Sequence, residues 1–301
     1  MKVLITGATG LVGQEIVKQC HSQNIDVNYL STNRSKIVID NNYKGFYWNP
    51  KTNEIDIDCF QEVDVIINLA GASVAKRWTD AYKKEILDSR LDGLRLLYTT
   101  IKNQNIPIRH LISASAIGIY PDSITQYYEE DFKIDGDGFL SKVTKQWENE
   151  AQKFEQIGVN LSIVRIGIVL SSKGGALPKL YKPIKNYVGA TLGNGKQWQS
   201  WIHIEDLAAL FLYLVSRKLY GTFNGVAPNA VTQGELVKAV AKTLKKPLLL
   251  PKIPSIVLKT LLGEMSTLVL ESQRVSSKKV EKLGFTFKQH HVQLAIDDLL
   301  L

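Results

Sequence analysis

The chain has 301 residues, of which 45% are hydrophobic and 22% are charged, and this composition is typical of a soluble globular protein. The formal net charge of +8 is spread along the chain without an aromatic-interleaved basic motif, so we expect no nucleic-acid partner. No apolar run is long enough for a membrane span, the first residues lack the apolar core of a signal peptide, and two cysteines make neither a disulfide framework nor a metal site. We therefore expect a cytoplasmic protein with no membrane partner and no metal.

The first part of the chain alternates short apolar runs with amphipathic segments. The expected strands are 2–6, 26–32, 44–49, 63–71, 110–116 and 160–170, and the expected helices are 11–23, 79–103 and 140–156. Strands that are apolar on both faces and alternate with helices are typical of a parallel sheet covered on both sides. Because crossovers between parallel strands are right-handed, the predicted fold class is α/β, with a Rossmann-type doubly wound parallel sheet.

After residue 170 the sequence becomes rich in glycine and is interrupted by prolines, which indicates loops and short helices. We expect a helix at 205–217, a short strand in 221–228, and a helix capped by Thr232, where Glu235 completes a capping box. The predicted division is a sheet domain over 1–170, completed by parts of 200–230, and a substrate-side region over 171–301. The second region includes a smaller, mostly helical C-terminal lobe.

Three glycines in "TGATGLVG" lie directly after the first strand and directly before the first helix. Glycine permits a tight turn and a close approach of backbone N–H groups to phosphate, and the helix N-terminus adds partial positive charge. This strand–loop–helix context predicts a dinucleotide-binding domain. The residues predicted to bind the cofactor here and at the ends of later strands are Gly7, Thr9, Gly10, Leu11, Val12, Gly13, Leu69, Ala70, Gly71, Ser113 and Ile166.

The end of the second strand bears on which nicotinamide dinucleotide is preferred. An NAD site usually has an acid there, which binds the ribose 2′-hydroxyl. This chain has Thr32, Asn33 and Arg34 instead, and an arginine suits a 2′-phosphate whereas a carboxylate would repel it. We expect NADP(H) to be preferred. NAD(H) stays open as the alternative, because Arg34 could equally be an exposed loop residue that contacts no cofactor.

The loop spacing after Thr6, together with "NLAG" at 68–71 and "SAS" at 113–115, resembles the extended short-chain dehydrogenase/reductase superfamily. The resemblance implies an active-site serine at Ser115 and a Tyr-x-x-x-Lys pair whose tyrosine is the general acid/base. The segment 136–151 should carry that pair but contains no tyrosine. The tyrosine position falls on Phe139 or Leu140 and the lysine position on Val143 or Thr144, while the pairs at 47/51, 98/102 and 181/185 lie elsewhere in the chain.

The segments "GGALPK", "WQSWIHIEDLA" and "FNGVAP", and a tail with "LLGE" and "KLGFTF", narrow the resemblance. Over essentially the whole chain they resemble the atypical extended members called YfcH-like, which are grouped with sugar-nucleotide epimerases and have a characteristic C-terminal lobe. These relatives commonly lack the tyrosine too, so its absence is not a sign of a decayed enzyme. The resemblance implies an NAD(P)-dependent epimerase or oxidoreductase acting on a small polar substrate such as a nucleotide sugar.

Several side chains remain as candidates for chemistry without the pair. The catalytic candidates are Ser115 and Tyr120, which could orient a substrate oxygen and supply a phenol; the substrate-binding candidates are Arg77, Arg90, Trp201 and His203. Each also has a structural explanation: a serine bonded to backbone, a core tyrosine or tryptophan, a surface ion pair, or a histidine at a helix start.

Two functions of different classes remain open. The first is an NADP(H)-dependent epimerase or oxidoreductase with a small-molecule substrate, working as a monomer or homodimer. The second is a non-catalytic NADP(H)-binding sensor or scaffold. The missing pair favours the second and the retained Ser115 and arginines favour the first, so we expect an enzyme.

Overall fold

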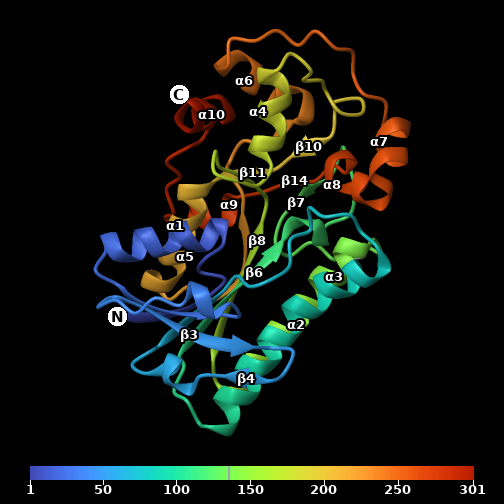
Figure 1. Ribbon diagram of the computed structural model, residues 1–301. Coiled ribbons are helices and arrows are strands. Elements are labelled where there is room, and N and C mark those ends of the chain that lie inside the picture. Colours follow the sequence, from blue (N-terminus) through green and yellow to red (C-terminus); the bar gives the residue numbers. More distant parts are fainter. Residues whose placement is uncertain (135) are drawn as a thin grey trace.

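The computed structural model describes residues 1–134 and 136–301, and its centre is an eight-stranded sheet in the order β12-β8-β6-β5-β1-β2-β3-β4 (Figure 1). The strands are β1 (Lys2–Thr6), β2 (Asp26–Ser31), β3 (Tyr43–Asn49), β4 (Glu54–Ile55), β5 (Val65–Asn68), β6 (His110–Ala116), β8 (Asn160–Ile166) and β12 (Gly221–Gly225). Neighbouring strands are parallel except for β4, which pairs antiparallel with β3. The predicted doubly wound fold is confirmed, and its strand order reverses between β1 and β5, where such sheets bind ligands.

Helices cover both faces of this sheet. On one face α1 (Leu11–Ser22) packs against α5 (Ile204–Arg217), and on the other α2 (Asp80–Asn103) packs against α3 (Phe139–Gln152) (Figure 1). Successive residues of a strand point to opposite faces, and Val3, Leu4 and Ile5 of β1 are all fully buried. The apolar runs of the sequence are therefore the central strands of a sheet with two covered faces.

After β8, most of the chain forms a lobe above the carboxyl ends of the strands, while α5 and β12 belong to the sheet domain (Figure 1). Its helices α4 (Leu177–Lys185), α6 (Gln233–Thr243) and α10 (Val292–Leu300) share a separate hydrophobic core. Its other elements are β9 (Ile168–Leu170), β10 (Trp198–Gln199), β11 (Trp201–His203), β13 (Val231–Thr232), α7 (Ser255–Leu262), α8 (Thr267–Leu270), β14 (Arg274–Val275) and α9 (Lys278–Lys282). The pairing of β14 with β7 (Tyr127–Tyr128) ties the C-terminal segment to the sheet domain.

Two expected elements differ from the structure at their ends. The strand expected over 160–170 is divided at Gly167, because β9 leaves the sheet there to pair with β11. A Cβ at Gly167 would lie 2.3 Å from the carbonyl oxygen of Ser200, so only glycine fits this close approach. The helix expected over 140–156 ends at Gln152 and continues as a 3₁₀ turn, Lys153–Ile157.

The described residues also bear on the membrane and metal expectations. None of their helices has both the length and the apolar character needed to cross a membrane. Within the same residues no group of three or more His, Cys, Asp and Glu side chains is placed to hold a metal ion. Cys20 and Cys59 are both buried and free, and burial raises the pKa of the Cys20 thiol to about 12.

Candidate cofactor and substrate site

The glycine loop shapes the N-terminus of α1. Gly7 has a positive φ of 74°, and its carbonyl oxygen accepts a hydrogen bond of 2.9 Å from the Gly10 N–H. A Cβ at Gly13 would lie 2.2 Å from that same oxygen, so α1 begins as close to β1 as glycine allows. No side chain caps α1 at Gly10 and its first turn has no acid, which leaves its first N–H groups available to an anionic phosphate.

Thr6, Asn68 and Ser113 fix the strand ends beside this loop. The Thr6 hydroxyl accepts hydrogen bonds of 3.1 Å from the N–H groups of both Leu69 and Ala70 and donates to Asn68 Oδ1 at 2.7 Å. Asn68 Nδ2 donates to Ser113 Oγ at 3.3 Å, and Ser113 is 1% exposed. Ser113, expected at the cofactor, instead positions the segment that carries Leu69 and Ala70.

A first cavity of about 530 Å³ opens between the glycine loop, the end of β2 and α2. Its predicted cofactor residues are Gly7, Thr9, Thr32, Asn33, Ala70 and Gly71, and its other lining residues include Ser31, Lys36, Lys51, Glu85 and Asp92. Two lysines therefore stand on the β2 side and two carboxylates on the α2 side. Arg34 does not line it among the described residues: its guanidinium lies 3.6 Å from the centre of the Tyr47 ring.

A second cavity, of about 350 Å³, lies on the other side of the loop, and both sets of walls meet at the segment 69–71. Val12, Leu69 and Ile166, three of the residues predicted to bind the cofactor, line it. Its further walls come from the end of β6, from α3, from β10, and from α8 and the segment after it. They include Ser115, Leu140, Thr144, Trp147, Trp198, Ser200, Thr267, Glu271 and Gln273. Its walls are thus assembled from segments far apart in the sequence.

Beneath the second cavity, a buried network holds Ser115 and Tyr120. The Ser115 hydroxyl donates to Glu148 Oε1 at 2.5 Å, and Arg165 makes two hydrogen bonds of 2.9 Å to the Glu148 carboxylate. Arg165 also donates to the Tyr120 hydroxyl, which donates to Asn224 Oδ1 at 2.8 Å. The hydroxyl hydrogens of both catalytic candidates are thus bonded to protein acceptors.

The same network sets the charge states of its members. Burial raises the pKa of Tyr120 to about 12, against the opposing effect of the Arg165 charge. Burial acts to lower the pKa of Arg165, but hydrogen bonds and charge from Glu148 outweigh it and hold that pKa above its usual value. A neutral Tyr120 and a charged Arg165 follow, so the network is a bidentate ion pair with a phenol that does not titrate near neutrality.

The two arginine candidates have different positions. Arg90 lines the second cavity and lies 5.0 Å from the Trp147 ring centre, but one of its nitrogens donates to the carbonyl oxygens of Ala72 and Ile86. Burial lowers the pKa of Arg90 to about 10, so it stays charged at neutral pH. Arg77 is exposed before α2 and lines none of the cavities found among the described residues.

Trp201 and His203 lie away from the second cavity. Trp201 is fully buried in the second core and its Nε1 donates to the Asn229 carbonyl oxygen at 2.8 Å, so it is a core residue. His203 caps α5 through an N–H bond of 3.2 Å from Glu205 to Nδ1. It faces another cavity, of about 420 Å³, which Leu11 also lines. The tryptophan that does line the second cavity is Trp198.

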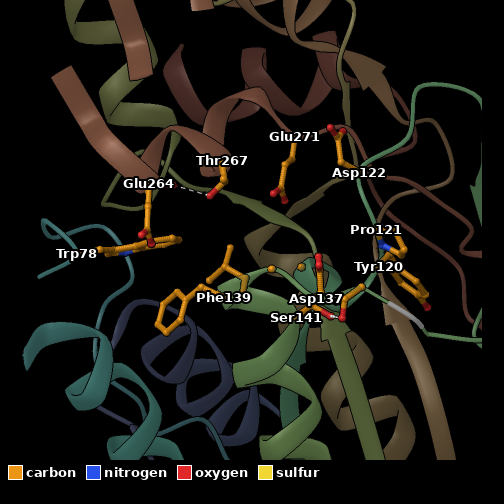
Figure 2. A pocket seen from close by; sticks show the side chains of 14 residues that line it. Trp78, Tyr120, Pro121, Asp122, Asp137, Phe139, Ser141, Glu264, Thr267 and Glu271 are labelled. Carbon is orange, nitrogen blue, oxygen red and sulfur yellow. Dashed lines mark hydrogen bonds between the residues drawn. The ribbon is translucent and has the colours of Figure 1, made fainter. Parts of the chain in front are cut away.

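A third cavity of about 360 Å³ adjoins the second, and Gly118, Leu140, Thr267 and Glu271 line both (Figure 2). Trp78 and Phe139 meet edge to face at 4.9 Å on one side of it. Its walls also carry four carboxylates, from Asp122, Asp137, Glu264 and Glu271. None of these four was predicted as a site residue: Glu264 stands in the "LLGE" segment without an assigned role, and no motif marks the other three.

The sequence model of the NAD dependent epimerase/dehydratase family matches residues 3–224, and that of a domain of unknown function (DUF1731) matches 253–299. The chain belongs to the NAD-dependent epimerase/dehydratase family. An epimerase family protein of Staphylococcus aureus strain MRSA252 is 39% identical over 99% of this chain and 98% of its own, and one of Staphylococcus haemolyticus is 36% identical with the same coverage. The resemblance to an atypical extended short-chain dehydrogenase/reductase with its own C-terminal lobe is confirmed.

Solved structures show the same fold. The human epimerase family protein SDR39U1 (isoform 2), crystallised with NADPH, superposes with a TM-score of 0.84 at 24% identity, over 99% of both chains. A nucleoside-diphosphate sugar epimerase from Corynebacterium glutamicum has a TM-score of 0.79 at 27% identity, over 100% of this chain and 58% of that one. The chain thus has the NAD(P)-binding epimerase fold over its whole length.

Proposed function

We propose that this protein binds NADP(H) and is an epimerase or oxidoreductase for a small polar substrate, without a Tyr–Lys pair. The adenosine half of the cofactor would lie in the first cavity and the nicotinamide in the second. The observation that carries the proposal is the pair of cavities on either side of an α1 N-terminus that has neither a side-chain cap nor an acid. A pyrophosphate spanning the two would meet free N–H groups and partial positive charge.

The first cavity supports the preference for NADP(H). The end of β2 presents Ser31, Thr32 and Asn33 to this cavity, and Lys36 and Lys51 line it as well. A 2′-phosphate would find hydroxyls and two ammonium groups there, and charge-assisted bonds of this kind stabilise it. The human structural relative was crystallised with NADPH, which agrees with this choice.

The charged residues that line the second and third cavities limit the class of substrate that these cavities could bind. Among the described residues that line the second and third cavities, Arg90 is the one cation, and its guanidinium already donates to two carbonyl oxygens. Four carboxylates line the third cavity, and of these Glu264 pairs with Lys83. A diphosphate arm would be repelled here, whereas the acids and the Trp78 and Phe139 rings suit a small hydroxyl- or amine-bearing molecule.

The residues that line the second cavity would hold the nicotinamide and its substrate in a largely apolar space. Leu140 and Thr144 stand on α3 where the superfamily places its pair, and Val12, Leu69 and Ile166 lie on the other walls. A bound nicotinamide dinucleotide supplies or accepts a hydride. The chain must position the reacting carbon, exclude water and handle a proton, and the apolar walls serve the first two tasks.

Equilibrium titration with NADPH and NADH, followed by nicotinamide fluorescence, tests this proposal. We expect NADPH to bind roughly tenfold or more tightly, since one charge-assisted phosphate contact contributes about 1.5–3 kcal/mol. Equal affinities would contradict the NADP(H) preference, and no binding of either would contradict the cofactor site itself.

The non-catalytic sensor or scaffold stays as a second candidate because the hydroxyls of Ser115 and Tyr120 are bonded within the protein. Turnover assays separate the two functions. NADPH oxidation with 9,10-phenanthrenequinone or DL-glyceraldehyde, or NADP+ reduction with UDP-glucose, would show an enzyme, and NADPH binding without turnover on a wider panel of carbonyls and alcohols would favour the sensor.

A further inference from the structure

The second cavity contains few groups that can exchange a proton. Its four hydroxyl side chains each already donate within the protein: Ser115 to Glu148, Thr144 to the Leu140 carbonyl, Ser200 to the Gln273 carbonyl and Thr267 to the Glu264 carbonyl. Of its two ionisable side chains in the described part of the chain, Arg90 remains a cation. The other is Glu271.

Glu271 stands at the junction of the second and third cavities, directly after α8. Figure 2 shows its carboxylate pointing into the space between the C-terminal segment and α3. Gln273 Nε2 donates to Glu271 Oε2 at 3.1 Å and so orients the carboxylate. The adjacent Ser272 is fixed on both sides, because its N–H donates to Asp122 Oδ1 at 2.7 Å and its hydroxyl accepts from the Trp198 N–H at 3.0 Å.

The surroundings of Glu271 favour its protonated form. Burial raises its pKa, the Gln273 hydrogen bond opposes this, and the negative charge of Asp122 raises it further. The other charged groups that line the two cavities are Asp137, Glu264 with its partner Lys83, and Arg90. A carboxyl whose pKa moves toward neutrality can both give and take a proton near the working pH.

We propose that Glu271 is the catalytic proton donor and acceptor of this site, in place of the missing tyrosine. This inference rests on the proposed function. When a carbonyl is reduced, the carbon receives the hydride and its electron pair, and the oxygen takes the proton of the Glu271 carboxyl to become a hydroxyl. The carboxylate then regains a proton from water. In the reverse direction the carboxylate takes the hydroxyl proton as the hydride leaves.

The proposal also gives a role to the C-terminal segment, which the model of a domain of unknown function matches over 253–299. Glu271 lies within that match. In typical superfamily members the proton donor comes from the helix that corresponds to α3. Here α3 presents Leu140 and Thr144 to the second cavity, and the segment between α8 and β14 faces them with a carboxyl.

The first test compares Glu271→Gln, which keeps shape and hydrogen bonding but cannot exchange a proton, with Glu155→Gln, an exposed glutamate outside the cavities. With NADPH and 9,10-phenanthrenequinone we expect Glu271→Gln to lower kcat by roughly 10²–10⁴-fold, with NADPH affinity within twofold of the unmodified protein. The pH–rate limb above the ordinary glutamate range should disappear in Glu271→Gln and persist in Glu155→Gln. Equal kcat in Glu271→Gln would overturn the proposal, and so would an unmodified protein that turns over no member of the carbonyl and alcohol panel.

A second measurement needs no turnover. Infrared difference spectra of the unmodified protein across acidic to neutral pH should contain a carboxylic-acid band that titrates above the ordinary glutamate range. Burial also raises the pKa of Glu130 and of Asp206, so Glu271 is the source of the part of that band which Glu271→Gln removes and Glu155→Gln retains. A band that Glu271→Gln leaves unchanged in size would contradict the assignment. Absence of NADPH binding alongside an intact band would remove the cofactor proposal instead, so the two failures are distinguishable.

Discussion

The first and second cavities lie on either side of the same glycine loop but are built differently. The walls of the first cavity all lie within residues 7–92. They come from the ends of strands, each directly after the apolar run that forms the strand, and from α2. The second cavity takes its walls from segments between Val12 and Gln273, including three from the second half of the chain. The difference separates the two halves of the proposed dinucleotide site: local motifs form the half that would bind phosphate, and long-range packing forms the half where chemistry would occur.

The strongest way to break the second cavity without touching the first is to remove Arg165 from the network beneath it. Arg165→Met leaves the Glu148 carboxylate buried without its bidentate partner, and breaking a buried pair in this way costs about 3–5 kcal/mol. Urea denaturation should show this loss of unfolding free energy.

Arg95→Met is the matched control, because Arg95 is 53% exposed and its contacts with Asp92 and Glu150 are long, at 3.4 Å, while the buried Glu150 keeps Lys153 as a second partner at 2.9 Å. It should cost less than about 1 kcal/mol. Similar losses in the two variants would mean that the buried network contributes no more than a surface pair.

A substitution in the glycine loop should instead disrupt the first cavity. In Gly13→Ala the added Cβ would lie 2.2 Å from the Gly7 carbonyl oxygen, which is backbone and cannot rotate away. We expect a loss of roughly 1–3 kcal/mol of stability and a weakening of NADPH binding by at least about tenfold, since the loop must shift. Gly174→Ala is the control, because its Cβ would meet only the Leu11 side chain at 3.4 Å. Unchanged NADPH affinity in Gly13→Ala would show that the loop does not hold the pyrophosphate.

The preference for NADPH over NADH tests which basic residue near the first cavity would contact a 2′-phosphate. Lys36→Glu should reduce the preference for NADPH over NADH by roughly tenfold, about 1.4 kcal/mol, because it replaces a cation that lines the cavity with an acid. Arg34→Asp should have a smaller effect, since that guanidinium lies over Tyr47. Paired titrations with both cofactors measure this, and a larger effect of Arg34→Asp would restore the arginine as the phosphate ligand.

The smallest expected effect is the pH dependence of stability at Glu271. Its pKa is raised in the folded protein, so the wild-type chain is most stabilised below the unfolded value and loses that stability as pH rises through the folded value. Glu271→Gln should therefore raise Tm relative to the unmodified protein at pH 8, with the difference shrinking toward pH 4. Thermal melts at both values check this, and a pH-independent difference would show that Glu271 titrates normally.

The contrast between a cavity built from local segments and one built from distant segments also explains what could be predicted from the sequence. Gly7, Gly10 and Gly13 follow an apolar run and precede a helical one, so their place in the fold is a local property. Thr32 and Asn33 could be placed because they directly follow β2, and both line the first cavity. The parallel sheet itself followed from strands that are apolar on both faces, and it is confirmed.

The second cavity could not be predicted in the same way. Trp198 and Trp201 look equivalent in sequence, but one lies on β10 at the cavity and the other on β11 in the core. The faces of such short strands depend on their pairing register, which no local pattern states. Ser115 occupies its expected strand end, yet the partner of its hydroxyl is Glu148, which is 33 residues away and carries no motif.

The pairing of β14 with β7 docks a segment from near the end of the chain onto the sheet domain. All residues that line the first cavity lie within 7–92, so they leave the ribosome well before the segment 264–273 that closes the second and third cavities. Domains form from the N-terminus as the chain is made. A growing chain therefore contains the glycine loop before it contains Glu271, and the second cavity stays open to water until the C-terminal segment docks.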